Sequence, residues 1–536
     1  MPHWIAAAAL CCAALPALAQ TPQQWREDLH YLAQQMPARH KNLFHTQPRA
    51  AFDAQVTALD GKLETLPRHR IIVELARIVA ATGDGHTNIA PTRDPKIGFR
   101  AYPLALYLFD DGLYIRAAAQ QHADLVGAKV LRIGRHSADQ AYALVRDVIG
   151  KDNEQGAKFF APHFLVMPEV LEGLGIAPDL TELSLELEQN GKRRTVTLRD
   201  ARPADMMPPD TDVSFMPKAG WVDARGAHQP LWLADAHAKH RYAYLPEHKL
   251  LYIQLNQIGD EKKETMKAFA ERMGQFIASH AVEKVALDLR LNRGGNGYLN
   301  QPVVVMLIKA LQIDRPGHLF LLIGRSTYSA AQFLTNDLEK YTHTIFIGEP
   351  SGGKPNSYGD SRKITLPNSG LTVRVSTLWW QGDERDLRAA TMPHIAADLR
   401  FDDYRNGRDP ALDAVLRYRP QLTLTQRLQP HTADPQALAQ AFAQWRADPA
   451  NRYADADLAL QQLGYALLAE KRAMQAVNVM TVWTQAAPNA ANAWDSLGEA
   501  YLHVGDKARA KAAYARALVL SPGSASAVEG MRKASP

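Results

Sequence analysis

The chain has 536 residues, of which 46% are hydrophobic, and its 33 glycines and 32 prolines are ordinary numbers for this length. This composition excludes a collagen-like or largely disordered chain and leaves room for several domains with real cores. The formal net charge of +5 is small and the arginines are scattered, so we expect no nucleic-acid partner.

The first 19 residues predict a secretory signal peptide. They form an apolar run that ends in Ala17-Leu18-Ala19, a small-x-small pattern typical of a cleavage site. The run is too short for a stable helix across a bilayer, and no later segment has the length or apolarity of one, so we expect no stable membrane insertion. Cys11 and Cys12 are the only cysteines, and neither follows the small residue that a lipoprotein signal requires. We therefore predict a periplasmic or secreted protein without a lipid anchor and, after cleavage, without disulfides.

The next 180 or so positions divide into a helical and a β-rich part. Residues 22–81 place apolar side chains at helical spacing in three successive stretches. From about residue 98 the pattern changes to short β-like runs, interrupted by a helical stretch at 138–150. Residues 181–199 predict a hairpin that turns at Asn190-Gly191.

Residues 201–235, rich in Pro, Asp and Met, predict a loop or linker. Beyond it, strand-like and helical runs alternate, which predicts βαβ units and a largely parallel sheet. The runs predicted as strands are 250–258, 284–292 and 318–324, and those predicted as helices are 262–280, 298–312 and the stretch from Ser329 onward.

The C-terminal part contains an internal repeat of 34 residues. The second copy matches the tetratricopeptide pattern at Trp494, Leu497, Gly498, Tyr501, Ala510, Tyr514, Ala517 and Pro522. The first copy has Leu463, Gly464, Ala476 and Pro488 at the corresponding places. This period predicts stacked helix pairs, with residues 430–456 as a degenerate capping pair, and such an array is a candidate surface for a protein partner.

Two segments carry the candidate chemistry. Ser329 follows the apolar run 318–324 and precedes a helix-like stretch, so its hydroxyl is expected to point outward beside the unpaired N–H groups of a helix start. Lys354 lies in the Gly-rich segment 348–360, and a lysine can activate a serine if its pKa is lowered. Taken singly, Ser329 also fits a helix cap and Lys354 a solvated loop charge.

Four segments together resemble the C-terminal processing (tail-specific) serine peptidases and their tricorn-type relatives. They are GDGHTNIAP (83–91), VALDLRLNRGGNG (285–297), GRSTYSAAQF (324–333) and GEPSGGKPNSYGD (348–360), and they follow one another in the family order. Lys354 lies 25 positions after Ser329, the spacing of the catalytic pair in the tail-specific branch.

The resemblance implies a multidomain α/β protein. It assigns residues 20–96 to an N-terminal helical segment of the peptidase, 97–200 to a PDZ-like β-rich module and 201–425 to the α/β peptidase core. A signal peptide (1–19) precedes these parts and an all-α tetratricopeptide-like domain (426–536) follows them.

The resemblance makes Ser329 the nucleophile and leaves its base open. In the tail-specific branch the base is the lysine, here Lys354, which a glutamine four places later orients; Tyr358 occupies that place here. In the tricorn-type branch a histidine activates the serine, and His86 matches it, although Gly85 stands where that branch has a serine. His86 also fits a structural histidine that holds its turn.

The resemblance further implies an oxyanion hole formed by backbone N–H groups of Gly294 or Gly295 together with Ala330. The alternative is a simple tight turn, in which Asp288 and Arg290 pin the end of the strand by an ion pair.

The sequence contains no zinc-binding HExxH, P-loop or Rossmann glycine motif, so we expect acyl transfer without a metal or cofactor. The predicted function is an exported serine peptidase acting on polypeptides. Two alternatives remain: an inactive peptide- or lipid-binding protein on the same fold, and a scaffold whose repeats dock a partner.

Overall fold

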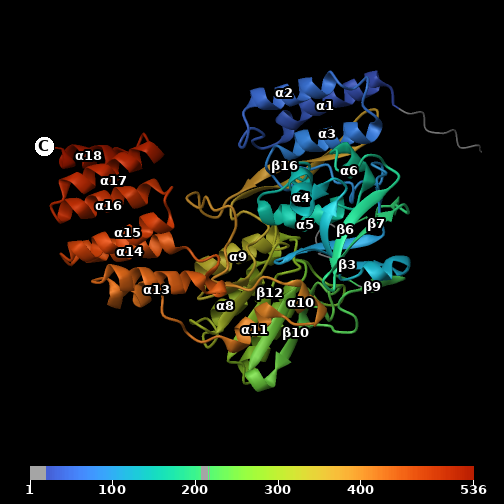
Figure 1. Cartoon of the computed structure of the whole chain (residues 1–536). Coiled ribbons are helices and arrows are strands. Elements are labelled where there is room, and N and C mark those ends of the chain that lie inside the picture. The colour runs from blue at the N-terminus through green and yellow to red at the C-terminus, as the bar shows by residue number, and fades with distance from the viewer. Residues whose placement is uncertain (1–19, 207–214, 217, 536) are drawn as a thin grey trace, which may run out of the picture.

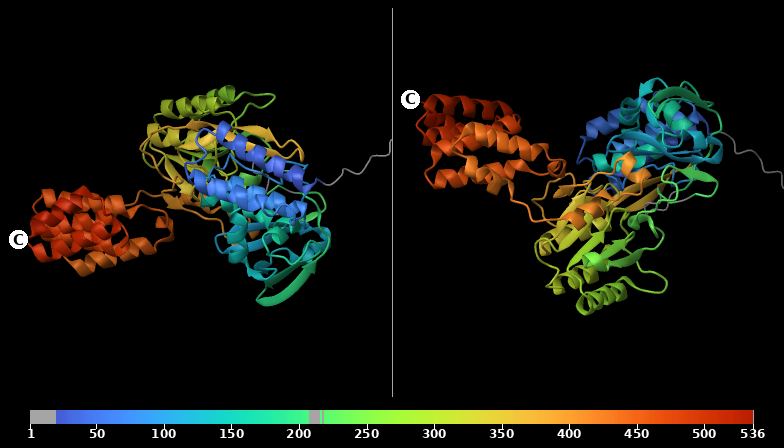
Figure 2. Two further views of the ribbon diagram at one scale, coloured as in Figure 1. Left: turned by 90° about the horizontal axis from the view of Figure 1, so that it is seen from above. Right: turned by 60° about the horizontal axis from the view of Figure 1, so that its bottom comes forward.

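The computed structural model describes residues 20–206, 215–216 and 218–535 (Figure 1). The predicted signal peptide (1–19) and part of the predicted linker lie outside these residues. Within them, a helical and β-rich N-terminal part covers an α/β core, and an array of helices stands to one side of both in every view (Figures 1 and 2).

Three N-terminal helices confirm the helical prediction for residues 22–81. The first begins at a capping box, in which the side chains of Thr21 and Gln24 each accept a hydrogen bond from the other residue's backbone N–H. Its buried residues, Trp25, Leu29, Leu32 and Met36, recur every three or four positions and face one hydrophobic core. The helices are α1 (Pro22–Arg39), α2 (Arg49–Asp60) and α3 (Arg68–Ala80).

An antiparallel sheet follows, with strand order β2-β3-β4-β6-β7. Its strands are β2 (Leu104–Phe109), β3 (Gly112–Ala119), β4 (Lys129–Ile133), β6 (Leu183–Gln189) and β7 (Lys192–Leu198), with β5 (His136–Ser137) beside β4. The hairpin β6–β7 turns at Asn190 and Gly191, both with positive φ, as predicted. The helices of this part are α4 (Ala138–Arg146), α5 (Glu154–Phe164) and α6 (Pro168–Gly173).

The linker prediction for 201–235 is wrong in part. Residues 221–223 form strand β9 (Trp221–Asp223), which pairs with β3, and β8 (Arg202–Pro203) pairs with β1 (Arg100–Ala101). These short strands are stabilised by a distant partner strand, a contact that local composition does not reveal.

The core confirms the predicted βαβ arrangement, because β11, β12, β13, β14 and β17 are parallel in a sheet ordered β10-β11-β12-β13-β14-β17. Alternate residues of β11 contribute to two different hydrophobic clusters, so both faces of the sheet are covered. The strands are β10 (His240–Leu245), β11 (Leu250–Leu255), β12 (Lys284–Asp288), β13 (Leu319–Ile323), β14 (Ile345–Gly348) and β17 (Ile395–Ala396). The helices are α7 (Met266–Ser279), α8 (Gln301–Lys309), α9 (Ala330–Tyr341), α10 (Phe401–Arg405) and α11 (Pro410–Arg417).

A long hairpin joins the core to the N-terminal part. Its strands, β15 (Ser357–Thr365) and β16 (Thr372–Trp380), leave the core after the lysine segment, and β16 packs against α1. Asn88 forms a backbone bridge with Arg374 of β16. The hairpin therefore brings the 83–91 segment to the edge of the core, where Ser329 lies.

The C-terminal array consists of α12 (Leu424–Leu428), α13 (Pro435–Ala447), α14 (Ala456–Ala469), α15 (Ala473–Ala486), α16 (Ala491–His503), α17 (Lys507–Leu520) and α18 (Ala525–Ala534). Each helix from α14 on packs against the next one along the chain. The array is tied to the rest of the chain where Tyr453 donates a hydrogen bond to Asp398 Oδ1 at 2.5 Å and Arg452 pairs with Asp110.

Across the described residues, no helix combines the length and apolarity needed to cross a membrane. The same residues contain no cluster of His, Cys, Asp or Glu that could hold a metal ion.

Candidate active site

Ser329 lies at the turn between β13 and α9, as the sequence predicts. Its backbone has φ 54°, a left-handed conformation that non-glycine residues seldom adopt and that is common at functional sites. The turn is held by Thr327, whose Oγ1 donates to the carbonyl of Leu289 and accepts from the N–H of Gly324, each at 3.0 Å. This anchoring to the neighbouring strand end offsets the strain at Ser329.

His86 lies against Ser329. Its Nε2 is 3.1 Å from Ser329 Oγ, and its Nδ1 is 2.7 Å from the hydroxyl oxygen of Tyr328. The Tyr328 ring also stacks on the imidazole, with ring centroids 4.6 Å apart. Ser329, His86 and Tyr328 thus form one continuous hydrogen-bonded chain.

A buried polar cluster fixes the turn that carries His86. Asp84 accepts hydrogen bonds from the backbone N–H of His86 at 2.8 Å and from the hydroxyl of Thr87 at 2.6 Å. The same carboxylate contacts Nε2 of His40, which is fully buried, at 3.1 Å. Ser376 of β16 completes the cluster through its backbone N–H, which donates to Thr87 Oγ1 at 3.0 Å.

Gly85 has a steric reason to lack a side chain. A Cβ at this position would lie 2.4 Å from the Tyr328 hydroxyl oxygen, far inside contact distance. A serine at this position, as in the tricorn-type branch, would therefore clash with Tyr328.

Burial sets the electrostatics of the site. It lowers the pKa of His86, and it raises the pKa of the Tyr328 hydroxyl well above its ordinary value. Asp152 is also buried, and burial together with the neighbouring Asp84 raises its pKa to about 7. Its Oδ1 accepts from the N–H of Gly85 at 2.7 Å, which places Asp152 directly behind the His86 turn.

The two glycines after Arg293 differ in their hydrogen bonding. The N–H of Gly294 donates to the side chain of Asn292 at 2.9 Å. The N–H groups of Gly295 and Ala330 have no acceptor among the described residues, and both residues border the same cavity as Ser329. Gly294 instead permits close approach, because a Cβ there would be 2.7 Å from Ser329 Cβ.

The ion pair suggested for the strand end is present. Arg290 contacts Asp288 at 2.6 Å and Asp409 at 2.7 Å, and all three side chains are largely buried. Arg290 thereby ties the end of β12 to the start of α11.

Lys354 lies beside Asp152 and not at the cavity. It makes no hydrogen bond with Ser329 among the described residues, and it does not border the cavity that contains Ser329. Tyr358, at the place of the orienting glutamine, packs its ring on His45 and Trp379, with centroids 4.4 and 4.5 Å away.

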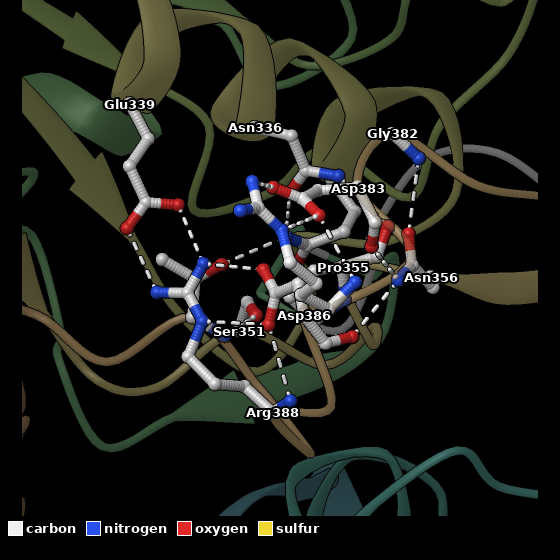
Figure 3. Close-up of polar contacts among 12 residues, drawn as sticks. Asn336, Glu339, Ser351, Pro355, Asn356, Gly382, Asp383, Asp386 and Arg388 are labelled. Carbon is white, nitrogen blue, oxygen red and sulfur yellow. Dashed lines mark hydrogen bonds and ion pairs between the residues drawn. The ribbon is translucent and has the colours of Figure 1, made fainter.

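The loop that carries Lys354 is held rigidly against α9 (Figure 3). Asn336 of α9 donates to the carbonyl of Pro355 at 2.8 Å, and Asn356 donates to the carbonyls of Asp383 and Asp386. Arg388 then bridges Asp386 and Glu339, so the loop, the following chain and the helix form one network.

A cavity of about 300 Å³ opens at Ser329 and His86. The glycine segment, the start of α9 and the first residues of β15 border it. The structure therefore brings Ser329, His86, Gly295 and Ala330 together around one space, and it places Lys354 outside that space.

Sequence reasoning missed Tyr328 and Asp152. The first was readable as the residue before the nucleophile, but its orientation toward His86 depends on packing between distant segments. The second lies in the loop between α4 and α5 and carries no local signal.

No family model matches the sequence, and no curated protein sequence matches it. Among solved structures, mature CPAF complexed with lactacystin matches with a TM-score of 0.52 and 13% identity, over 74% of this chain and 98% of that one. A second structure of mature CPAF gives a TM-score of 0.53 and 14% identity over 74% and 96%. This chain has the fold of the C-terminal processing serine peptidases. The photosystem II D1 C-terminal processing protease matches over 74% and 96% at 14% identity, with a lower TM-score of 0.33.

Proposed function

We propose that the protein is a serine peptidase that hydrolyses polypeptides, with Ser329 as nucleophile and His86 as its general base. The observation that carries the proposal is the 3.1 Å distance from His86 Nε2 to Ser329 Oγ, at a strained strand-to-helix turn on a peptidase fold. The N–H groups of Gly295 and Ala330 would stabilise the oxyanion, since both are without an acceptor beside the serine.

The geometry of the hydrogen-bonded series Ser329–His86–Tyr328 sets the protonation state of each member. To take the proton from Ser329, His86 must be neutral with its proton on Nδ1, where it donates to the Tyr328 oxygen 2.7 Å away. The lowered pKa of His86 keeps the imidazole neutral near pH 7, and the raised pKa of Tyr328 keeps the phenol protonated. Tyr328 thus takes the orienting role that a carboxylate has in a Ser-His-Asp triad.

Hydrolysis then proceeds in two steps. Ser329 Oγ attacks the scissile carbonyl while its proton moves to His86 Nε2, and the imidazolium returns that proton to the leaving amine. Water, deprotonated by the same nitrogen, releases the acyl group and restores Ser329.

Purified wild type and variants, incubated with unfolded casein and with a fluorophosphonate probe, test the proposal. We expect Ser329→Ala and His86→Ala to abolish cleavage, Lys354→Ala to retain most of it, and Ser279→Ala at the exposed end of α7 to behave as wild type. Casein cleavage by purified Ser329→Ala would refute Ser329 as the nucleophile. If Lys354→Ala loses cleavage and His86→Ala retains it, the base is Lys354. A wild type that neither cleaves nor reacts with the probe favours the inactive binding protein.

We also propose that residues 97–200 act as a PDZ-like module that grips the substrate. The support is a small antiparallel sheet, β2 to β7, with α4 packed on β4 and with an edge at β7 that pairs with no other strand of the described residues.

For residues 426–536 we propose tetratricopeptide-like repeats that dock a protein partner. The support is the close packing of paired helices at Gly464 and Gly498. A Cβ at Gly464 would lie 2.7 Å from Met480, and a Cβ at Gly498 would lie 2.8 Å from Tyr514. Deletion of 426–536 should abolish partner binding and leave casein cleavage intact. The signal-like residues 1–19 lead us to propose export to the periplasm or beyond, which fractionation of cells expressing the full chain tests.

A further inference from the structure

The cavity at Ser329 extends along one face of α9. Ser329, Phe333 and Asp337 are four residues apart in succession, so their side chains lie on the same side of the helix, and all three border the cavity. At a rise of about 1.5 Å per residue, Asp337 lies about 12 Å along the axis from the nucleophile. The serine and the Asp337 carboxylate thus border the same cavity at positions two helical turns apart.

Aromatic rings also border this cavity. The ring centroids of Phe333 and Trp380 are 5.5 Å apart. Tyr298, which borders the cavity just after the glycine segment, is 83% exposed. Such walls suit a side chain with a long apolar stem.

The charges around the cavity have one sign. Among the described residues that border it, Asp337 and Asp360 are the only ones with a full charge, since His86 is neutral and no Lys or Arg takes part. Asp360 accepts a hydrogen bond from Trp380 Nε1 at 2.6 Å, which positions its carboxylate beside the ring.

Asp337 has no such partner. It forms neither a hydrogen bond nor an ion pair with any described residue, although it is half buried. Burial raises its pKa, and Lys340, three positions later on α9, opposes this through its charge without forming an ion pair. A half-buried carboxylate without a partner is costly unless a ligand supplies the positive charge.

We propose that this cavity receives the side chain of the residue on the acyl side of the scissile bond, and that Asp337 selects lysine or arginine there. The stem of such a side chain packs along the adjoining Phe333 and Trp380 rings, and its cationic head reaches Asp337 with a cation–π contact to the rings on the way. The inference rests on the proposed function, because Ser329 defines which bond is cut.

Cleavage-site mapping by mass spectrometry on unfolded casein tests the preference. Wild type is expected to cut predominantly after Lys and Arg. For matched peptides with Lys or norleucine before the scissile bond, Asp337→Asn should lower the Lys-to-norleucine ratio of kcat/KM by tenfold to a hundredfold, the order expected for a hydrogen bond to a charged group. Asp337→Lys should reverse the preference toward Glu, and Glu271→Gln, an exposed carboxylate change on α7, serves as the control.

Binding separates this inference from the proposed function. The Ser329→Ala variant is titrated with the same fluorescent Lys and norleucine peptides, with and without Asp337→Asn, and thermal melts verify that each variant is folded. Cleavage by wild type without enrichment for Lys or Arg, or a ratio unchanged by Asp337→Asn, overturns the pocket assignment and leaves the peptidase intact. If wild type never cleaves but binds the Lys peptide, and Asp337→Asn weakens that binding, the peptidase proposal is refuted and the pocket assignment stands.

Discussion

Replacing Tyr328 by Phe isolates the hydrogen bond that orients the base. The change removes the oxygen 2.7 Å from His86 Nδ1 and keeps the ring that stacks on the imidazole at 4.6 Å. When His86 accepts the serine proton, its Nδ1–H then has no acceptor in a buried site. An unsatisfied buried polar group costs about 1–3 kcal/mol, which corresponds to a loss of about fivefold to 150-fold in rate.

The loss should fall on kcat, with KM nearly unchanged, because Tyr328 contacts the base and lies outside the cavity lining. Steady-state hydrolysis of a fluorogenic peptide found by the casein mapping measures both constants. Tyr341→Phe, an exposed change at the end of α9, is the matched control. A Tyr328→Phe enzyme that keeps wild-type kcat, with an unaltered melting temperature, would refute the orienting role.

Three further predictions concern the same site. Activity should depend on neutral His86, whose pKa is lowered by burial. A plot of kcat/KM against pH should therefore rise and level off below the ordinary histidine pKa of about 6.5. A rise in kcat/KM that continues well above pH 6.5 would argue against His86 as the base. Gly294→Ala should lose activity by at least about a hundredfold, since its Cβ would meet Ser329 Cβ at 2.7 Å and φ is +115°, and equal activity in a casein assay contradicts this. Asp152 keeps its proton up to about pH 7 in the folded state and loses it near 3.8 when unfolded, so its effect is to lower stability as pH rises between these values. Asp152→Asn can still accept the hydrogen bond from the N–H of Gly85. Calorimetry should therefore show a higher melting temperature for this variant than for wild type at pH 8, and no difference at pH 4.

The parallel core was predictable because its strands are mostly apolar runs separated by helical periodicity, as in 250–258 and 318–324. The repeat was visible as a period of 34 residues, while its assignment as a tetratricopeptide array stays a proposal. Strand β9 was not predictable, because Trp221–Asp223 becomes a strand only by pairing with β3. Short edge strands depend on a partner distant in the chain, and neither composition nor periodicity records that partner.

The amino-acid sequence by itself determined the position of Ser329, the glycine segment beside it and two rival bases, since these depend on local motifs and their order along the chain. Only the tertiary structure decided how the rivals lie: His86, 243 positions before Ser329, has its Nε2 at 3.1 Å from the hydroxyl, whereas Lys354, only 25 positions away, lies outside the cavity. The physical reason is that the β15–β16 hairpin and the buried Asp84 cluster bring the N-terminal turn onto the nucleophile, and contacts of that kind follow from packing rather than from spacing in the sequence.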